Sequence, residues 1–405
     1  MNPTDFLPQA PGSLVATIQG EFAFVPDPLP PTVSLDAVGL KYADAMQAIG
    51  ELRGACRRLT NPWILIRPLQ RHEALTSSAM EGTFTTEDNL LLAEAGISAA
   101  TKNESTQEVI NYLDALGGSI EMLKTLPISH RLIRTAHQTL LSNLSSERGA
   151  QKRPGEYKQE QNWIGGRTID TARYVPPPPT QAQQAMDDLE RYINRENQKF
   201  PPPLIDMALV HYQLEAIHPF ADGNGRVGRM LISLMAIHSG LLEMPVLYLS
   251  PVLENKKDEY IDLMFNVSSR GEWGPWLLFF FDRVIESCAE TVGIIDSLID
   301  AQTHMRSIVG KESRSASAMS LVDHLLTTPV VTVTEAARKL GVTYAAAKST
   351  VQKFETLGFL KPMDNSYPKV YYSPPIIRAT RPPEITRSEK TGAASDRPSQ
   401  PSLFD

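Results

Sequence analysis

The sequence has few of the features that mark secreted or membrane proteins. Its 405 residues include only two cysteines, Cys56 and Cys288, far apart in the chain, so we expect no disulfide framework and a reducing compartment. The N-terminal segment has neither the basic stretch nor the apolar stretch that directs secretion. The longest apolar runs, such as residues 276–281, are far too short to cross a bilayer. We therefore expect a cytoplasmic protein without a membrane partner.

An excess of positive charge is also absent. The chain has 39 Lys and Arg against 46 Asp and Glu, for a formal net charge of −7. This balance argues against a protein that coats nucleic acid, although it leaves a small basic patch open. The motif G-x-x-x-x-G-K-[S/T] does not occur, which excludes a P-loop nucleotide site. Apolar residues make up 42% of the chain, enough to fill the cores of two or three domains.

One twelve-residue stretch concentrates the groups that carry chemistry. Residues 218–229 read His-Pro-Phe-Ala-Asp-Gly-Asn-Gly-Arg-Val-Gly-Arg. The apolar residues before and after this stretch recur at helical spacing, which predicts a helix–loop–helix junction. The glycine-rich turn would point free N–H groups and the positive end of a helix dipole at one spot. Such a spot favours a bound phosphate.

Two other binding motifs match this stretch only in part. Its glycines satisfy the dinucleotide-binding pattern G-x-G-x-x-G, but that pattern needs a preceding strand, and the residues before it are helical. From Asp222 the sequence resembles the start of a calcium-binding EF-hand loop. The fifth and twelfth loop positions are Arg226 and Ser233, however, and the twelfth needs a glutamate. Phosphate binding therefore remains the interpretation.

The side chains of the stretch suit catalysis on a nucleotide. Arg226 and Arg229 are three residues apart, so they share one face of the expected helix and can grip phosphate oxygens. Asp222 is an oxygen ligand suited to a Mg²⁺ ion that bridges phosphates. His218 titrates near neutrality and can accept the proton of an attacking hydroxyl. These residues predict a nucleotide-phosphate site with a base beside it.

The whole stretch strongly resembles the signature of the Fic (filamentation induced by cAMP) family, because every family position is filled. The resemblance implies an all-α fold with a helical core and a small β-hairpin flap. It also implies transfer of AMP from ATP to a Ser, Thr or Tyr hydroxyl of a target protein or of the chain itself. His218 would be the catalytic base, and Asp222 would hold Mg²⁺ on the phosphates. The implied ATP-binding residues are Gly223, Asn224, Gly225, Arg226, Val227, Gly228 and Arg229, with Tyr248 and Tyr260 at the adenine. The target and the exact nucleotide stay open.

A β-prone segment interrupts the helical pattern between residues 153 and 179. Two short runs around glycines predict a hairpin there, with a plain surface loop as an equal alternative. The segment resembles the flap of the Fic family, which pairs with an extended, hydroxyl-bearing segment of the target protein. The flap residues implied by this resemblance are Trp163, Ile164, Gly165, Tyr174 and Val175.

A second motif precedes the core. Ser77-x-x-x-Glu81-Gly82 resembles the family's inhibitory motif, and Ser77 and Glu81 share a helix face because they are four residues apart. The resemblance implies that the Glu81 carboxylate faces Arg229 and takes the place of the γ-phosphate of ATP. The same glutamate could position a water that removes AMP from a modified target. A bifunctional or mainly de-AMPylating enzyme is therefore the alternative.

The chain as a whole is expected to have four parts. These are an N-terminal helical region with the inhibitory helix at 1–105, a catalytic core at 106–310, a winged helix-turn-helix at 311–375 and a disordered tail at 376–405. The order helix, helix, glycine-containing turn, helix and extended segment is typical of a winged helix-turn-helix. The tail has little to bury, which is typical of disorder.

The third helix of the expected winged module has residue types that contact bases or phosphates. They are Tyr344, Lys348, Gln352 and Lys353. DNA binding through residues 334–375 is therefore one hypothesis, and protein contact is its alternative. An ATP-sensing transcriptional regulator is a second functional class, but sensing needs no base such as His218 beside the phosphates. The oligomeric state stays open, a homodimer included.

Overall fold

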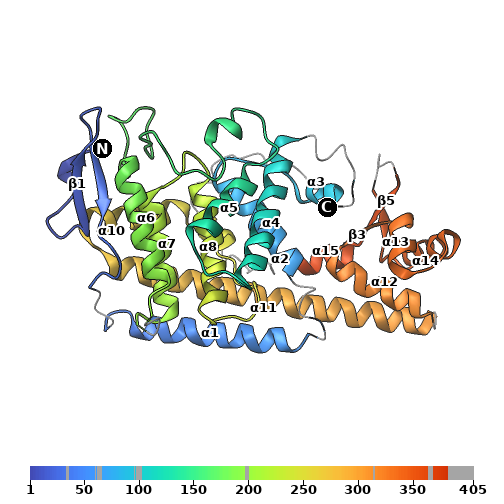
Figure 1. Ribbon diagram of the computed structural model, residues 1–405. Coiled ribbons are helices and arrows are strands. Elements are labelled where there is room, and N and C mark those ends of the chain that lie inside the picture. The colour runs from blue at the N-terminus through green and yellow to red at the C-terminus, as the bar shows by residue number, and fades with distance from the viewer. Residues whose placement is uncertain are drawn as a thin grey trace, which may run out of the picture. The chain divides into compact units, whose positions relative to one another are not determined.

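The described part of the chain is mostly helical, as the sequence predicted, and carries one two-stranded and one three-stranded sheet (Figure 1). The computed structural model describes residues 1–32, 36–59, 61, 66–94, 96, 103–196, 200–312, 315–363 and 368–381. The chain divides into two compact units. The first comprises Met1–Gly50, Glu73–Phe84 and Gln107–Cys288, and the second comprises Glu51–His72, Thr85–Thr106 and Ala289–Asp405.

These units differ from the contiguous domains expected from the sequence. The boundary expected near residue 310 falls inside α11 (Trp273–Glu312), which is one uninterrupted helix. The helix ends two residues beyond Gly310, whereas the division between the two units falls earlier in α11, between Cys288 and Ala289. Three further helices also contribute residues to both units, namely α1 (Gly39–Arg57), α2 (Ile66–Met80) and α4 (Glu104–Leu123).

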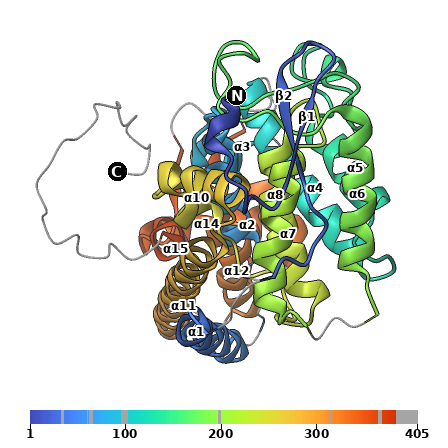
Figure 2. The ribbon, with the colours of Figure 1, turned by 90° about the vertical axis from the view of Figure 1, so that its left-hand side faces the viewer.

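The first unit is built around α7 (Pro203–Ile217), which is buried on nearly every side. This helix packs against α6 (Pro179–Ile193), α8 (Asn224–His238) and α10 (Lys257–Arg270), and α6, α7 and α8 run side by side (Figures 1 and 2). The remaining helices of this unit include α4 (Glu104–Leu123), α5 (His130–Leu140) and α9 (Ser250–Glu254). Because neighbours cover it all round, α7 has apolar residues on every face, and its polar side chains such as Asp206 and His211 are buried as well.

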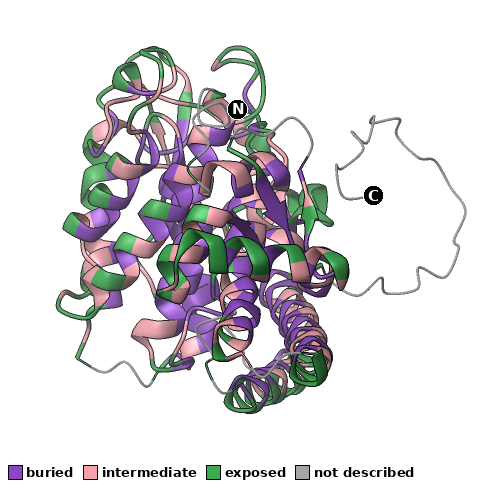
Figure 3. Ribbon diagram, turned by 90° about the vertical axis from the view of Figure 1, so that its right-hand side faces the viewer, coloured by how far each residue is buried: buried purple, intermediate pink, exposed green. Residues whose placement is uncertain are grey.

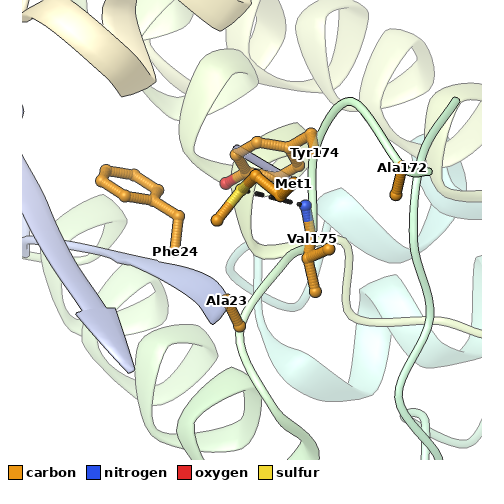
Figure 4. Packing of buried hydrophobic residues seen from close by; sticks show 6 residues of the cluster. All are labelled: Met1, Ala23, Phe24, Ala172, Tyr174 and Val175. Atoms are coloured by element: carbon orange, nitrogen blue, oxygen red, sulfur yellow. Dashed lines mark hydrogen bonds between the residues drawn. The ribbon is translucent and has the colours of Figure 1, made fainter. Parts of the chain in front are cut away.

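The N-terminal segment forms a hairpin that the expected helical region at 1–105 does not include. Strands β1 (Gly12–Ala16) and β2 (Phe22–Pro26) pair antiparallel. The N–H of Phe24 donates to the carbonyl of Val175 at 2.9 Å. Met1 and Phe24 are buried in one apolar cluster with Tyr174 and Val175 of the segment expected to be the flap (Figure 4). The hairpin therefore forms part of the surroundings of that segment.

The second unit combines a small sheet with short helices. Its elements in chain order are α3 (Glu87–Glu94), α12 (Ala316–Thr327), β3 (Val330–Thr332), α13 (Val333–Leu340), α14 (Tyr344–Thr356), β4 (Lys361–Pro362), β5 (Val370–Tyr372) and α15 (Pro374–Thr380). The sheet order is β3-β5-β4, and every residue of β3 and β5 is buried (Figure 3). Leu91 of α3 packs against Val330 and Val370 of this sheet.

The disorder expected from residue 376 onward is wrong for the start of that segment. Residues 374–380 form α15, and Ile376 and Ile377 are buried. Two adjacent isoleucines after a proline-started turn give this short helix something to bury, which the polar residues farther on lack. Residues 382–405, the rest of the expected tail, lie outside the described residues.

Two sequence expectations concern membranes and thiols. In the part of the chain that the structure describes, no helix is both long enough and apolar enough to cross a membrane. Cys56 and Cys288 are buried, and neither is in a disulfide. Burial raises the pKa of the Cys56 thiol, which makes it a poor nucleophile at neutral pH.

Candidate active site

Residues 218–229 form the helix–loop–helix junction that the sequence predicted. His218 ends α7 in a left-handed conformation, with φ of 48° and ψ of 60°, and its N–H donates to the carbonyl of Leu214 at 2.9 Å. After the loop, Gly223 (φ 78°) leads into α8, which begins at Asn224. The first amides of α8 have no partner within the helix and lie at its positive end, which suits an anion.

Asn224 shapes this loop from inside. Its side-chain oxygen accepts from the N–H of Phe220 at 2.8 Å, and its side-chain nitrogen donates to the carbonyl of Phe220 at 2.9 Å. Both ends of the amide are therefore used by the backbone. Asn224 was expected to bind ATP directly. In the structure its side chain instead holds the backbone of the loop in place.

Neighbouring residues hold the loop from outside. The side chain of Asn162 donates to the carbonyls of His218 (3.1 Å) and Phe220 (3.0 Å). His137 stacks on Phe220 with ring centroids 3.8 Å apart, donates from Nε2 to the carbonyl of Asp222 and accepts from the N–H of Gly155 at Nδ1. Sequence reasoning missed Asn162 and His137, because their distance in sequence from the motif carries no signal of contact.

A cavity of about 230 Å³ opens beside the junction. It brings together His218, Gly225 and Arg229 of the motif with Glu81 of the second motif. The other residues that line it include Ile164, Arg173, Tyr174, Glu215, Lys257 and Tyr260. Tyr260, expected at an adenine, is thus part of the cavity wall. Its hydroxyl lies 2.7 Å from Nε2 of His211.

The expected site residues that do not line this cavity include Tyr248, Arg226 and Trp163. Tyr248 is buried, and its carbonyl accepts from the hydroxyl of Ser287 at 2.7 Å. Arg226 donates to the Glu108 carboxylate at 3.0 Å, and both side chains are 4% exposed. Helical spacing predicted that Arg226 shares a helix face with Arg229. The guanidinium of Arg226 instead pairs with the carboxylate of Glu108 on α4. Trp163 is partly exposed and lines a separate surface pocket.

Glu81 and Arg229 form an ion pair at the edge of the cavity. Oε1 of Glu81 lies 2.8 Å from a terminal nitrogen of Arg229, and the same guanidinium donates to the hydroxyl (2.9 Å) and carbonyl (2.8 Å) of Ser77. A Cβ placed on Gly225 would lie 2.2 Å from Oε1 of Glu81. The carboxylate therefore rests directly against the first turn of α8, where the motif favours an anion.

Two further contacts fix the segment that carries Glu81. Lys257 of α10 donates to the carbonyl of Met80, so its positive charge lies at the C-terminal end of α2, where the helix dipole is negative. The hydroxyl of Thr83 donates to Glu108 at 2.7 Å, the same carboxylate that binds Arg226. Both motif arginines are thus connected to this segment, Arg229 directly and Arg226 through Glu108.

The charges of the site set its protonation. Burial lowers the pKa of His218 to about 4, and the nearby Lys158 acts in the same direction, so the imidazole is neutral at pH 7. Partial burial raises the pKa of Glu81, but Arg229, and then Arg226 and His218, outweigh it and bring the pKa below its usual value. The site at neutral pH therefore presents a neutral base and an ionised carboxylate paired with a cation.

The expected flap is shorter than a regular hairpin. It consists of one antiparallel bridge, in which Ile164 and Tyr174 exchange hydrogen bonds of 2.8 and 3.1 Å, closed by a loop through Gly165 and Gly166. Both glycines have positive φ, and a Cβ on Gly166 would lie 2.5 Å from the carbonyl of Thr171. The hydroxyl of Tyr174 donates to the carbonyl of Ala216, which attaches the bridge to the end of α7.

Comparisons with known proteins match this arrangement. Residues 127–236 match the model of the Fic/DOC family, and residues 40–121 match that of the Fic/DOC family N-terminal region. Proteins named protein adenylyltransferase Fic from Drosophila yakuba and Drosophila melanogaster are each 26% identical over 242 residues, 59% of this chain and 44% of theirs. The chain thus matches less than half the length of these relatives.

The fold has a counterpart among solved structures. A Fic family protein from Desulfovibrio desulfuricans superposes with a TM-score of 0.54 at 18% sequence identity, covering 85% of this chain and 98% of that protein. At that identity the likeness concerns the fold alone. The two matched regions lead to one assignment: residues 127–236 form a Fic/DOC domain, preceded at residues 40–121 by a Fic/DOC N-terminal region.

Proposed function

We propose that the cavity beside α8 is the active site of a protein adenylyltransferase, which transfers AMP from ATP to a Ser, Thr or Tyr hydroxyl of a target protein. The observation that carries this proposal is that His218 and Arg229 line one cavity with Gly225 at the N-terminus of α8. A base, a cation and an anion-binding helix end are the groups that nucleotidyl transfer needs. The name of the curated relatives adds support.

The chemistry follows from these positions. The target hydroxyl oxygen attacks the α-phosphorus of ATP, the bond from that phosphorus to the bridging oxygen of the β-phosphate breaks, and pyrophosphate leaves. His218, neutral at pH 7, accepts the hydroxyl proton. The amides at the start of α8 stabilise charge on the phosphate oxygens, and Arg229 binds the γ-phosphate.

A Mg²⁺ ion would be held by Asp222 together with phosphate oxygens. The Asp222 side chain is 44% exposed at the loop, and Mg²⁺ commonly uses one or two carboxylates plus substrate phosphates. When bound, the ion neutralises charge on the phosphates. His137 holds the backbone carbonyl of Asp222, and the N–H of Gly223 donates to Oδ1 of its carboxylate at 2.6 Å, so this chain presents the carboxylate in a defined direction.

The Glu81 carboxylate holds the enzyme in a restrained state in this proposal. It pairs with the guanidinium of Arg229 and lies against the first turn of α8, where a γ-phosphate would bind. Its side chain is 38% exposed, so it is attached through a few polar contacts and not through a core. Removal of this carboxylate would let ATP bind in a pose suited to attack.

Labelled ATP tests the transfer directly. The Glu81→Gly variant incubated with ATP labelled at the α-phosphate is expected to label itself or a lysate protein, and ATP labelled at the γ-phosphate is not. Glu81→Gly with His218→Ala is expected to stay unlabelled. Mass spectrometry of the product identifies the added group and the modified residue. Equal labelling by the native chain and Glu81→Gly would reject the restraint, and label from the γ-phosphate would reject AMP transfer.

Removal of AMP is a second candidate activity at the same site. Glu81 and His218 line one cavity, so the carboxylate can orient a water toward an AMP-modified hydroxyl. A target modified by Glu81→Gly and then given to the native chain separates the two directions. Release of AMP that the Glu81→Gln variant cannot perform would favour this activity.

We also propose that residues 315–372 act as a winged helix-turn-helix that contacts DNA. The helix–strand–helix–helix–strand–strand order supports this proposal. Tyr344, Lys348 and Gln352 are exposed at successive turns of α14, whereas Lys353 donates to the carbonyl of Glu312. Lys348→Glu is therefore expected to abolish a gel shift on genomic fragments, and Lys353→Glu is expected to weaken it less. A gel shift that requires ATP would favour a nucleotide-sensing regulator.

A further inference from the structure

A second carboxylate, Glu215, lies beside Arg229 and has no part in the mechanism above. Glu215 is in the last turn of α7, three residues before His218, and lines the same cavity. A Cβ on Gly228 would lie 2.2 Å from its Oε1, so the carboxyl rests against α8 one turn beyond Glu81. Among the described residues this buried oxygen has no hydrogen-bond partner. Buried carboxyl oxygens are rarely left in that state.

The groups around Glu215 come from four elements. Glu81 follows α2, Arg229 is on α8, Tyr260 is on α10, and His211 and His218 belong to α7. His211 is not a charge partner, because burial lowers its pKa to about 3 and both ring nitrogens are used, by the carbonyl of Gly228 and the hydroxyl of Tyr260. Burial raises the pKa of Glu215 to about 7. The charge of Arg229 lowers this pKa, and the charge of Glu81 raises it.

Arg229 therefore interacts with two carboxyl groups of the cavity wall, Glu81 and Glu215. A third buried carboxyl near Arg229, Glu73, already accepts hydrogen bonds from Tyr112 and Ser250. The Glu81 side is also the side where a phosphate would bind. The buried guanidinium needs one anion nearby, because an isolated buried charge is costly. Two anions beside Arg229 would repel each other. An ionised Glu81 or a bound phosphate next to Arg229 therefore favours the protonated form of Glu215.

We propose that Glu215 is a proton-exchanging partner of Arg229. Near neutral pH it is partly protonated when the Glu81 carboxylate or the γ-phosphate of ATP lies against Arg229, and it ionises more fully when that side is empty. This inference rests on the proposed ATP site. Its consequence is that ATP binding to a chain without Glu81 takes up a proton from solution, and that a neutral Glu215 can donate a hydrogen bond to a phosphate oxygen.

Calorimetric titration of ATP tests this inference. The background is Glu81→Gly with His218→Ala, which removes both the competing carboxylate and turnover. Titrations in two buffers of different protonation enthalpy give the number of protons taken up. We expect a few tenths of a proton per ATP near pH 7, and an affinity that falls about tenfold from pH 6 to pH 9. When Glu215→Gln is added, the proton uptake and the pH dependence of affinity that come from Glu215 are lost. Any remaining proton uptake comes from ATP itself and from groups such as Lys158.

Matched variants keep the test decisive. Asp206→Asn removes another buried carboxylate of α7, one that binds Tyr192 and Arg195 outside the cavity, and should leave the uptake unchanged. Glu215→Asp should retain a titrating group. Zero uptake in the starting background, or equal uptake with Glu215→Gln, would overturn the inference while leaving the ATP site intact. No ATP binding by any variant would overturn the inference and the proposed function together.

Discussion

Oε1 of Glu81 lies 2.8 Å from the guanidinium of Arg229, which also donates to the hydroxyl and the carbonyl of Ser77. One short segment thus supplies three acceptors to one buried cation. The carboxylate provides the charge, and Ser77 holds the orientation of the guanidinium. In the restrained state proposed above, release would require only that Glu81 move, because Ser77 is part of α2 and can stay in place.

Ser77→Ala is expected to loosen the restraint in part. The change removes the acceptor of the Arg229 Nε–H but keeps the carbonyl of Ser77 and the Glu81 carboxylate. Loss of one hydrogen bond to a charged group costs about 1.5–3 kcal/mol. We therefore expect self-labelling from ATP to rise severalfold, to a level below that of Glu81→Gly.

Ser78→Ala provides the matched control. Ser78 is equally buried on the same helix, and its hydroxyl has no hydrogen-bond partner among the described residues. Its removal should leave labelling unchanged. A Ser78→Ala effect as large as that of Ser77→Ala would show that helix stability, and not the contact with Arg229, controls labelling.

Glu108 is expected to be a major contributor to stability. Its carboxylate binds Arg226 (3.0 Å), Arg148 (2.6 Å) and Thr83 (2.7 Å) while being only 4% exposed. Removing one partner of a buried ion pair leaves an uncompensated charge and costs about 3–5 kcal/mol. Glu108→Gln should lower the free energy of unfolding by about this amount in urea titrations. Arg148→Gln, at a 42% exposed position, should cost under about 1 kcal/mol.

Buried histidines make stability depend on pH. Burial lowers the pKa of His137 to about 4, whereas an unfolded histidine titrates near 6.5. Between these values the unfolded chain binds the proton more readily, so the free energy of unfolding falls as pH drops from about 6.5 to about 4. His137 should account for up to about 3 kcal/mol of this loss. Urea titrations at several pH values, with His137→Gln for comparison, measure the effect. An identical slope for the variant would assign the loss to other buried groups, among them His211 and His218.

The junction at 218–229 could be predicted from the sequence, because it depends on local spacing and on a motif with many positions. The Glu81–Arg229 pair joins residues 148 positions apart and was expected only from the resemblance to the family's inhibitory motif. The partner of Arg226 could not be predicted. Helical spacing places Arg226 and Arg229 on one face, but Glu108, 118 residues earlier, decides where the Arg226 side chain goes. The same limit applies to His137 and Glu215, since a single histidine or glutamate on a helix has no sequence feature that identifies its tertiary neighbours. Tyr248 was placed by resemblance alone, and it lies in a core.

The N-terminal hairpin was missed for a related reason. Its strands are five residues each, and prolines around residues 26–31 dominate the pattern. The hairpin packs on residues of the flap that are 150 positions away, so no local signal reveals its contact. Its effect on the flap can still be measured.

Phe24→Ala is expected to loosen the flap. The Phe24 ring is fully buried against Tyr174, with centroids 6.2 Å apart, and the cluster includes Ile164 and Phe265, both of which line the cavity. A buried Phe→Ala change costs about 3–5 kcal/mol. We expect faster hydrogen exchange at the amides of Ile164 and Tyr174 and a raised KM for a target peptide at unchanged affinity for ATP. Phe22→Ala, two residues away and 43% exposed, should change neither. If Phe24→Ala speeds exchange throughout the first unit, the hairpin supports the whole core and not the flap in particular. If exchange at the flap stays slow, the bridge between Ile164 and Tyr174 is held by α7 alone, through the hydrogen bond from Tyr174 to Ala216.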